Sequence, residues 1–194
     1  MKPFNIFLLG ALLFAANNLQ AQDNYSISAF TVTIDGTSNL HSWNERVEKV
    51  SGKGIVNWSA NKSFALQSFN IVMQVNSIKS DEGSTMNNKT YKALKSDQFP
   101  AITFLLTDPL ALLAPGVSSH SVAAKGKLTI AGVTKPVTIP IKISEDANKK
   151  ITIVGSQEVK MTDYGVDPPT ALFGVLKTGD AITISFNTTF SSIN

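Results

Sequence analysis

Most of the chain alternates apolar and polar residues, and this pattern constrains the fold more than any other feature of the sequence. In residues 137–143 Val and Ile alternate with Thr, Pro and Lys, and residues 182–187 repeat the same rhythm. A period of two is typical of strands that have one buried and one exposed face. Many such strands must bury their apolar faces against one another. The sequence therefore predicts an antiparallel β-barrel or β-sandwich.

The pattern predicts eight to ten strands and one helix. The expected strands lie near residues 26–35, 38–47, 50–58, 66–78, 102–106, 122–130, 137–143, 151–161 and 181–190. Gly52 and Gly54 fall inside a strand, where glycines often mark a bulge or a tight bend. The rhythm breaks once, at residues 86–94, where apolar side chains follow helical spacing and Ser84 or Thr85 is a suitable N-cap. This helix should end before Phe99-Pro100.

The first 21 residues have the three parts of a secretory signal. Lys2 gives a positive start, residues 6–16 are an apolar run, and Ala21 is a small residue suited to cleavage. The run is shorter than the roughly 20 residues that span a bilayer, which argues against a permanent anchor. We therefore expect a removed signal at 1–21 and one domain at 22–194, in a periplasmic or secreted protein.

Charge gives no sign of a nucleic-acid partner. The whole chain has 17 Lys+Arg and 14 Asp+Glu, and removal of Lys2 with the signal leaves 16 against 14. Nucleic-acid-binding proteins gather basic residues on one face with aromatic residues between them. Here the lysines are scattered through turns, and Arg46 is the only arginine. We predict no nucleic-acid partner and no transmembrane segment.

Residues that carry most enzyme chemistry are few in this sequence. It contains no cysteine and two histidines, His41 and His120, far apart in the chain and not at metal-ligand spacing. No Gly-x-Ser-x-Gly motif supplies a nucleophile. His41 precedes Trp43 by two residues, so on a strand both side chains would share a face. His41 is then foremost a structural hydrogen-bonding histidine, next a contact to a ligand headgroup, and least a catalytic residue. We predict no enzyme activity, no metal and no cofactor.

The apolar face itself is the remaining candidate site. A barrel can enclose a small molecule, and lipid sites are mostly apolar with few polar groups. From the residues alone, a ligand cavity and an ordinary filled core are equally compatible with this face. A structural barrel with a filled core is therefore one alternative. An enzyme that acts on an apolar substrate in the same pocket is a less favoured one.

Several segments, in order over nearly the whole mature chain, together resemble the YceI-like family. They are Gly36 to Trp43 (GTSNLHSW), Met86 to Phe104 with its FPAITF ending, Gly126 to Val137 (GKLTIAGVTKPV), Met161 to Pro169 with its MTDYG start, and the Gly179-Asp180 turn. The resemblance implies an all-β, lipocalin-like fold: an extended antiparallel eight-stranded barrel with one short helix inserted between strands. It also implies export, no cofactor chemistry and a long isoprenoid ligand, such as a polyisoprenoid or a quinone tail.

Alternation, rather than a family signature, selects the residues expected to contact this ligand. The predicted ligand-binding residues are Phe30, Val32, Ile34, His41, Trp43, Phe69, Ile71, Met73, Tyr91, Leu94, Phe104, Leu106, Leu128, Ile139, Ile141 and Phe186. The headgroup is expected near the mouth, by His41 or the 163–178 loop. Some relatives carry a histidine near the helix, where this chain has residues 90–92 (TYK). Ligand identity and oligomeric state stay open, a homodimer included.

Overall fold

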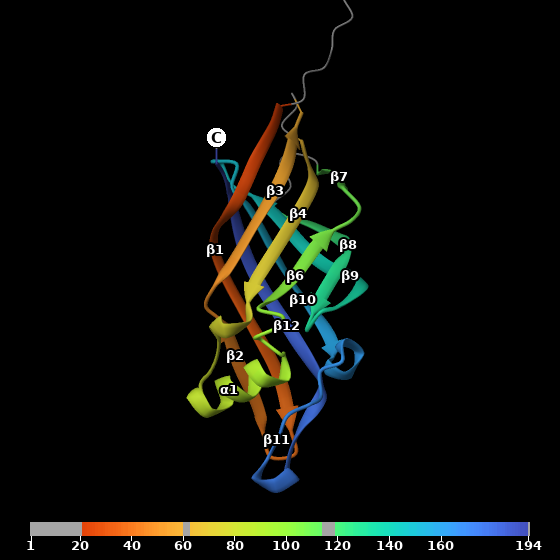
Figure 1. Cartoon of the computed structure of the whole chain (residues 1–194). Helices are drawn as coiled ribbons and strands as arrows, with labels where there is room; N and C mark the ends of the chain where they lie inside the picture. The colour runs from red at the N-terminus through yellow and green to blue at the C-terminus, as the bar shows by residue number, and fades with distance from the viewer. Residues whose placement is uncertain (1–20, 60–62, 114–118, 194) are drawn as a thin grey trace, which may run out of the picture.

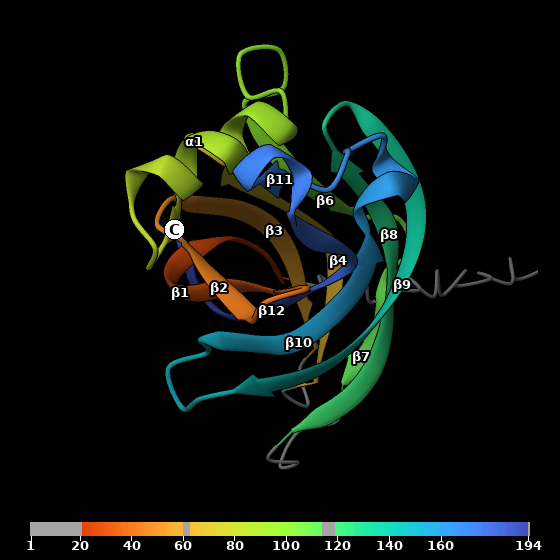
Figure 2. The ribbon, with the colours of Figure 1, turned by 90° about the horizontal axis from the view of Figure 1, so that it is seen from below.

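The computed structural model describes residues 21–59, 63–113 and 119–193, and over these residues the chain forms a closed antiparallel barrel. Eight strands follow one another around it in the order β12, β10, β9, β8, β6, β4, β3 and β1. Pairing of β1 with β12 closes the ring, which is seen end-on in Figure 2. The predicted eight-stranded barrel with one inserted α-helix is confirmed. The predicted signal lies outside the described residues except for Ala21, which pairs with Trp58.

The strands are long, which gives the barrel its elongated shape (Figure 1). The barrel strands are β1 (Ala21–Ser38), β3 (Val50–Trp58), β4 (Phe64–Gln74), β6 (Ala101–Leu106), β8 (His120–Ile130), β9 (Val133–Glu145), β10 (Ile151–Lys160) and β12 (Leu176–Ser192). The further strands are β2 (Ser42–Val47), β5 (Ile78–Ser80), β7 (Leu110–Leu113) and β11 (Thr170–Ala171). Short 3-10 turns lie at η1 (Val75–Ser77), η2 (Met161–Tyr164) and η3 (Leu172–Gly174).

The interior is apolar over most of the length of the barrel, because every second residue of each strand points inward and most of these residues are apolar. Two clusters of buried side chains fill its two halves: one contains Tyr25, Phe64 and Phe190, and the other contains Ile34, Met161 and other apolar residues. Four half-buried side chains pack against both clusters and join them. They are Ile71, Phe104, Val137 and Phe186. The dry face predicted from alternation is therefore one continuous lining.

The β8–β9 hairpin has the tight connection that its glycine predicts. Its two turn residues, Ala131 and Gly132, have φ of 47° and 82°, and Ile130 pairs with Val133 across them. Positive φ at both central positions is the geometry of a two-residue hairpin turn that matches the twist of the strands. The ring of Phe99 lies against Gly132, where a Cβ atom would come within 2.4 Å of it. Glycine is therefore needed here for conformation and for space.

The α-helix α1 (Ser84–Ala93) lies across one end of the barrel beside β2 (Figure 1). It begins one residue after Gly83, which is its N-cap and has no side chain to accept a hydrogen bond. The predicted cap by Ser84 or Thr85 is therefore wrong, because the extended-to-helix change falls at the glycine. As predicted, the helix ends before Phe99, and a turn with Lys95 at φ of 54° follows it.

Candidate functional site

Two adjacent cavities lie inside the barrel, of about 100 Å³ and about 80 Å³. The inner cavity, in the middle of the barrel, is lined by Val32, Leu66, Phe69, Ile71, Met73, Phe104, Leu106, Leu110, Ala124, Leu128, Ile139, Ile141, Ile153, Gln157, Ile184, Phe186, Thr188 and Phe190. The outer cavity, towards α1, is lined by Ile34, Trp43, Glu45, Ser80, Met86, Lys89, Thr90, Ala93, Leu94, Ile102, Ile130, Val159, Met161, Tyr164, Val166, Pro169, Thr178, Ile182 and Ile184. Ile184 belongs to both linings, so the two cavities are neighbours along one axis.

Inward-facing glycines keep large rings against the wall of the inner cavity. Three phenylalanines each lie over a glycine on a neighbouring strand: Phe69 over Gly54, Phe104 over Gly126, and Phe186 over Gly155. At Gly126 a Cβ atom would come within 2.4 Å of the Phe104 ring, closer than carbon atoms approach. Each ring therefore occupies the space that a side chain would fill if the glycine were another residue. This leaves the axis of the barrel free.

The end of the barrel away from α1 is closed by aromatic side chains. Tyr25, Trp58 and Phe64 are all buried there, and the Trp58 and Phe64 ring centroids are 5.0 Å apart. The Tyr25 hydroxyl donates a hydrogen bond of 3.0 Å to the carbonyl of Lys149, and burial raises the pKa of this phenol. An apolar chain in the inner cavity would therefore meet a closed end in this direction.

The end near α1 is the polar end of the interior. Glu45, on the inner face of β2, is 5% exposed, and its Oε1 accepts a 2.6 Å hydrogen bond from the Thr90 hydroxyl of α1. Burial raises the pKa of this carboxyl, the Thr90 hydrogen bond opposes the rise, and the nearby charge of Glu82 adds to it. Ser80 and Lys89 also line this cavity. An otherwise apolar interior thus ends in a small polar site.

Most of the residues selected by alternation line these cavities. The inner cavity contains ten of them: Val32, Phe69, Ile71, Met73, Phe104, Leu106, Leu128, Ile139, Ile141 and Phe186. The outer cavity contains three: Ile34, Trp43 and Leu94. Phe30, His41 and Tyr91 line neither. The structure gives the positions of these side chains, and their contact with a ligand stays a prediction.

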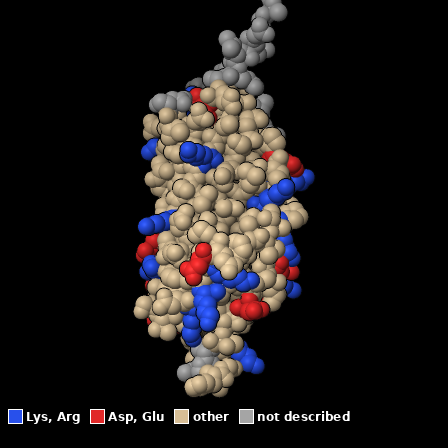
Figure 3. Space-filling model, viewed as in Figure 1, with Lys and Arg blue, Asp and Glu red and all other residues tan. Residues whose placement is uncertain are grey.

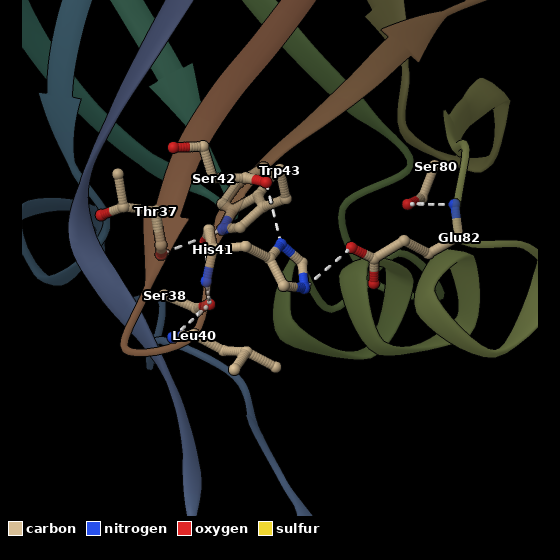
Figure 4. A network of polar contacts seen from close by, with 8 residues as sticks. All are labelled: Thr37, Ser38, Leu40, His41, Ser42, Trp43, Ser80 and Glu82. Carbon is tan, nitrogen blue, oxygen red and sulfur yellow. Dashed lines mark hydrogen bonds and ion pairs between the residues drawn. The ribbon is translucent and has the colours of Figure 1, made fainter.

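His41 does not share the inward orientation of Trp43, so the expectation built on their spacing is wrong. β2 begins at Ser42, and His41 belongs to the turn before it, where its N–H donates to the Ser38 hydroxyl. Its exposed ring lies outside the barrel, with Nδ1 2.8 Å from the Ser42 carbonyl and Nε2 3.5 Å from the Glu82 carboxylate (Figure 4). Side chains at positions i and i+2 share a face only within a strand, and His41 lies in the turn before the strand begins.

Tyr91 and Phe30 pack near the interior without lining a cavity. The Tyr91 hydroxyl accepts a 2.8 Å hydrogen bond from the Lys79 ammonium and lies 2.8 Å from the carbonyl of Ile78, so it ties α1 to β5. Phe30 is half-buried against the cluster at the α1 end. Both have a structural role in this geometry, because their polar or apolar contacts are made within the protein.

Sequence reasoning missed the polar residues that line the two cavities. Glu45 follows Trp43 by two residues, so alternation along β2 carried the signal that it faces inward. Thr90 was considered as part of the helix, but its hydrogen bond to Glu45 joins residues 45 positions apart. The inward positions of Gln157 and Thr188 follow the same alternation on β10 and β12. A charged residue is usually solvated, so the sequence pattern alone does not predict that Glu45 is buried.

The described part of the chain carries little other chemistry. It contains no cluster of three or more His, Cys, Asp or Glu residues placed to hold a metal ion. None of its helices is long and apolar enough to cross a membrane. On the face seen in Figure 3, charged residues of both signs are dispersed without a single-sign surface. This distribution agrees with the scattered charges of the sequence.

Comparison with known proteins agrees with this geometry. A polyisoprenoid binding domain from Saccharophagus degradans, implicated in plant cell wall breakdown, superposes with a TM-score of 0.67 at 15% identity, covering 87% of this chain and 98% of that one. BcnA of Burkholderia cenocepacia gives 0.59 at 20% identity, with coverages of 84% and 96%. The YceI protein of Campylobacter jejuni gives 0.55 at 16% identity, with coverages of 77% and 84%.

At these identities the structures establish a shared fold. No curated protein matches the sequence. The family model described as the YceI-like domain, however, matches residues 18–190, which is most of the chain. Its match includes α1 and every strand of the barrel, except for the last two residues of β12. The chain therefore belongs to the YceI-like domain family.

Proposed function

We propose that this protein is an exported lipid carrier that holds a long isoprenoid-type chain in the interior of its barrel. The observation that carries the proposal is the inner cavity, an apolar space whose rings are held to the wall by glycines. Each buried methylene contributes about 0.8 kcal/mol, so a long chain can bind without any polar contact. The similarity to a polyisoprenoid binding domain supports the same ligand class.

The cavity also weighs against a filled structural barrel. A filled core would leave few voids larger than a water molecule, whereas here two neighbouring cavities of about 100 and 80 Å³ lie on one axis. An enzyme would need a pair of titratable groups that face the substrate. His41, one of the two histidines of the sequence, lies in an exposed turn outside the barrel. Glu45 and Lys89 line the outer cavity, but the described lining of the inner cavity, which would hold the chain, has no titratable side chain. We therefore assign binding without turnover.

Export is part of this proposal and is supported by the signal-like pattern of the first 21 residues. Cell fractionation and the intact mass of the purified protein test it. We expect the protein outside the cytoplasm, with a mass reduced by removal of residues 1–21. A cytoplasmic protein of full-length mass would contradict export, while leaving lipid binding to be judged by its own experiment.

Mass spectrometry of organic extracts, from protein purified out of its native envelope, tests the bound ligand. We expect an isoprenoid in extracts of the wild type and none in extracts of Phe104→Asp, whose carboxylate would enter the inner cavity. Leu105→Asp is the matched control, because Leu105 is the next residue on β6 and is 48% exposed on the outside. Both variants are first checked for folding by circular dichroism. Normal lipid content in a folded Phe104→Asp protein would contradict the proposed site.

A further inference from the structure

The buried carboxyl of Glu45 has a hydrogen-bonding capacity that the protein does not fill. Thr90 donates to Oε1, and Oε2 makes no hydrogen bond to any of the described residues. Oε2 is not fully enclosed by the protein, and Glu45 lines the outer cavity. A carboxyl group that is buried without a full set of partners is costly. A ligand group that donates to Oε2 would relieve that cost.

Glu45 is placed where a headgroup would arrive. It lines the outer cavity, which follows the inner cavity along the barrel axis, and the opposite end is closed by Trp58 and Phe64. A lipid whose tail occupies the inner cavity must therefore leave its headgroup towards α1. Lys89, the other charged group of this lining, is only half-buried. The more deeply buried group, Glu45, should dominate the choice of headgroup.

We propose that Glu45 is the headgroup-recognition residue, and that it selects an uncharged headgroup with a hydrogen-bond donor, such as a hydroxyl, over an anionic phosphate. This inference rests on the proposed lipid-binding function and adds the chemical class of the headgroup. A hydroxyl donates to Oε2 without adding charge. A phosphate would place a second negative charge beside the carboxylate, in surroundings of low dielectric constant that strengthen the repulsion.

Three probes with the same C20 isoprenoid tail separate the headgroup from the tail: geranylgeraniol, its methyl ether and geranylgeranyl phosphate. Their dissociation constants are measured at pH 8 by displacement of a fluorescent apolar probe. In the wild type we expect the alcohol to bind about tenfold more tightly than the ether, the effect of one hydrogen bond to a charged acceptor. Glu45→Leu should bind both equally, and Glu45→Gln should improve the relative affinity of the phosphate.

The outcomes separate this inference from the function on which it rests. A wild type that binds the phosphate more tightly than the alcohol would overturn the inference. So would an alcohol preference that persists in Glu45→Leu. Glu45→Gln keeps the shape and the acceptor of the side chain, so the phosphate comparison remains available if Glu45→Leu does not fold. If none of the three probes binds to the wild type, the lipid-binding function itself fails.

An independent observation concerns the barrel wall between β9 and β10. These strands pair from Ile151 with Glu145 to Gly155 with Ile141, and the pairing then stops, although both strands continue. The next opposed position on β9 would be Pro140. On β9, Val133 forms a hydrogen-bonded pair with Ile130 across the tight turn. The backbone N–H and C=O groups of odd-numbered β9 residues therefore point to β8, and those of even-numbered residues point to β10. Pro140 therefore lacks an N–H group on the side where the ladder would need one.

The unpaired stretch forms a seam, which we define as residues 133–140 of β9 and 156–160 of β10. Within it, the side chain of Gln157 donates a 2.6 Å hydrogen bond to the Glu158 carbonyl, one of the backbone groups left without a ladder partner. Ile139 and Gln157 line the inner cavity, and Val159 lines the outer one. The seam thus runs beside both cavities, and few backbone bonds would have to break to widen it.

The geometry also points to this seam as the side opening through which the lipid tail enters and leaves. This second inference rests on the proposed lipid-binding function, but it does not depend on the role of Glu45. Threading a long chain end-on into a barrel that is closed by aromatic residues requires the whole chain to slide along its axis. A lateral opening lets the chain move in sideways. The β4–β6 and β6–β8 ladders are as short, with five and four pairs, but there the length is limited by the short strand β6. Only β9 and β10, among the neighbouring barrel strands described, both continue well beyond the end of their ladder.

A covalent bridge across the seam tests this route. The chain has no cysteine, so Thr138→Cys with Glu158→Cys places the only two thiols on opposite, exposed sides of the seam. They are joined by oxidation or by a short bifunctional thiol reagent. Lys142→Cys with Val154→Cys is the matched control, because these exposed residues face each other within the paired part of β9 and β10. Transfer of a preloaded C20 isoprenoid alcohol to phosphatidylcholine vesicles is then followed over time.

We expect the bridged seam to slow transfer by about tenfold or more, since exchange differences of this kind appear mainly in the off-rate. The control bridge should leave the rate within about twofold of the wild type. Equal rates for the bridged seam and the control would overturn the side opening and leave passage at the α1 end. If the unbridged protein retains no lipid to transfer, lipid binding fails rather than the route. Pro140→Val, which restores the missing N–H, should slow transfer without a bridge.

Discussion

A methyl group added at Gly126 tests whether the barrel is built to keep its axis open. In Gly126→Ala the new Cβ would lie 2.4 Å from two atoms of the Phe104 ring and 2.6 Å from the Leu105 carbonyl oxygen. Carbon atoms pack at about 3.5–4.0 Å, so the ring must move by roughly 1 Å. The wall lies behind the new methyl group, and the free space lies in the inner cavity. We therefore expect the ring to move into the cavity.

The expected consequences are a moderate loss of stability and a larger loss of lipid. Overpacking of this kind costs about 1–3 kcal/mol of unfolding free energy, whereas a cavity of about 100 Å³ that receives part of a ring loses much of its room. Urea unfolding measures the first quantity, and the isoprenoid content of purified protein measures the second. Ala123→Val is the matched control, because it enlarges a small residue on the exposed face of the same strand, three positions before Gly126.

Shortening the displaced ring should restore much of what the methyl group removes. In the double variant Gly126→Ala with Phe104→Leu, the smaller side chain relieves the contact with the ring, while the 2.6 Å approach to the Leu105 carbonyl oxygen remains. Lipid content should therefore recover, and stability should recover in part. Residues in contact commonly show interaction energies of about 0.5–3 kcal/mol in such a cycle. If Gly126→Ala keeps its full lipid content, or if the two substitutions act independently, the role assigned to the glycines is wrong.

Three further predictions follow from the two ends of the barrel. Because burial raises the pKa of Glu45, its contribution to stability is present below the ordinary pKa of glutamic acid and is lost as pH rises through the raised value. Glu45→Gln should therefore match the stability of the wild type in acid and unfold at a higher urea concentration than the wild type at pH 8. Equal urea midpoints at pH 8 would contradict the burial argument. His41→Ala removes one exposed contact to Glu82 and should change stability by less than about 0.5 kcal/mol and leave lipid content unchanged; loss of lipid would restore His41 as a ligand contact. Trp58→Ala opens the closed end beside Phe64 and should cost about 3–5 kcal/mol in thermal or urea unfolding; a near-neutral result would show that this end is not packed as described.

The sequence by itself determined the strands and the inward face of most of them. Period-two alternation is a local property of extended backbone, so Phe69, Ile71 and Met73 could be placed on one inner face without knowledge of any partner strand. The single break in the pattern located α1 for the same reason. The ordered motifs then predicted the family, whose domain matches residues 18–190.

Only the tertiary structure decided which side chains meet across strands and where alternation ends. The hairpin turn, rather than the spacing from Trp43, places His41 outside. The register between β6 and β8 puts Phe104 over Gly126, and the register between β9 and β10 puts Pro140 where the ladder stops. Register and turns depend on contacts between distant parts of the chain, which a local pattern does not contain. The polar end of the interior was hidden for the same reason, because Glu45 and Thr90 meet only after folding.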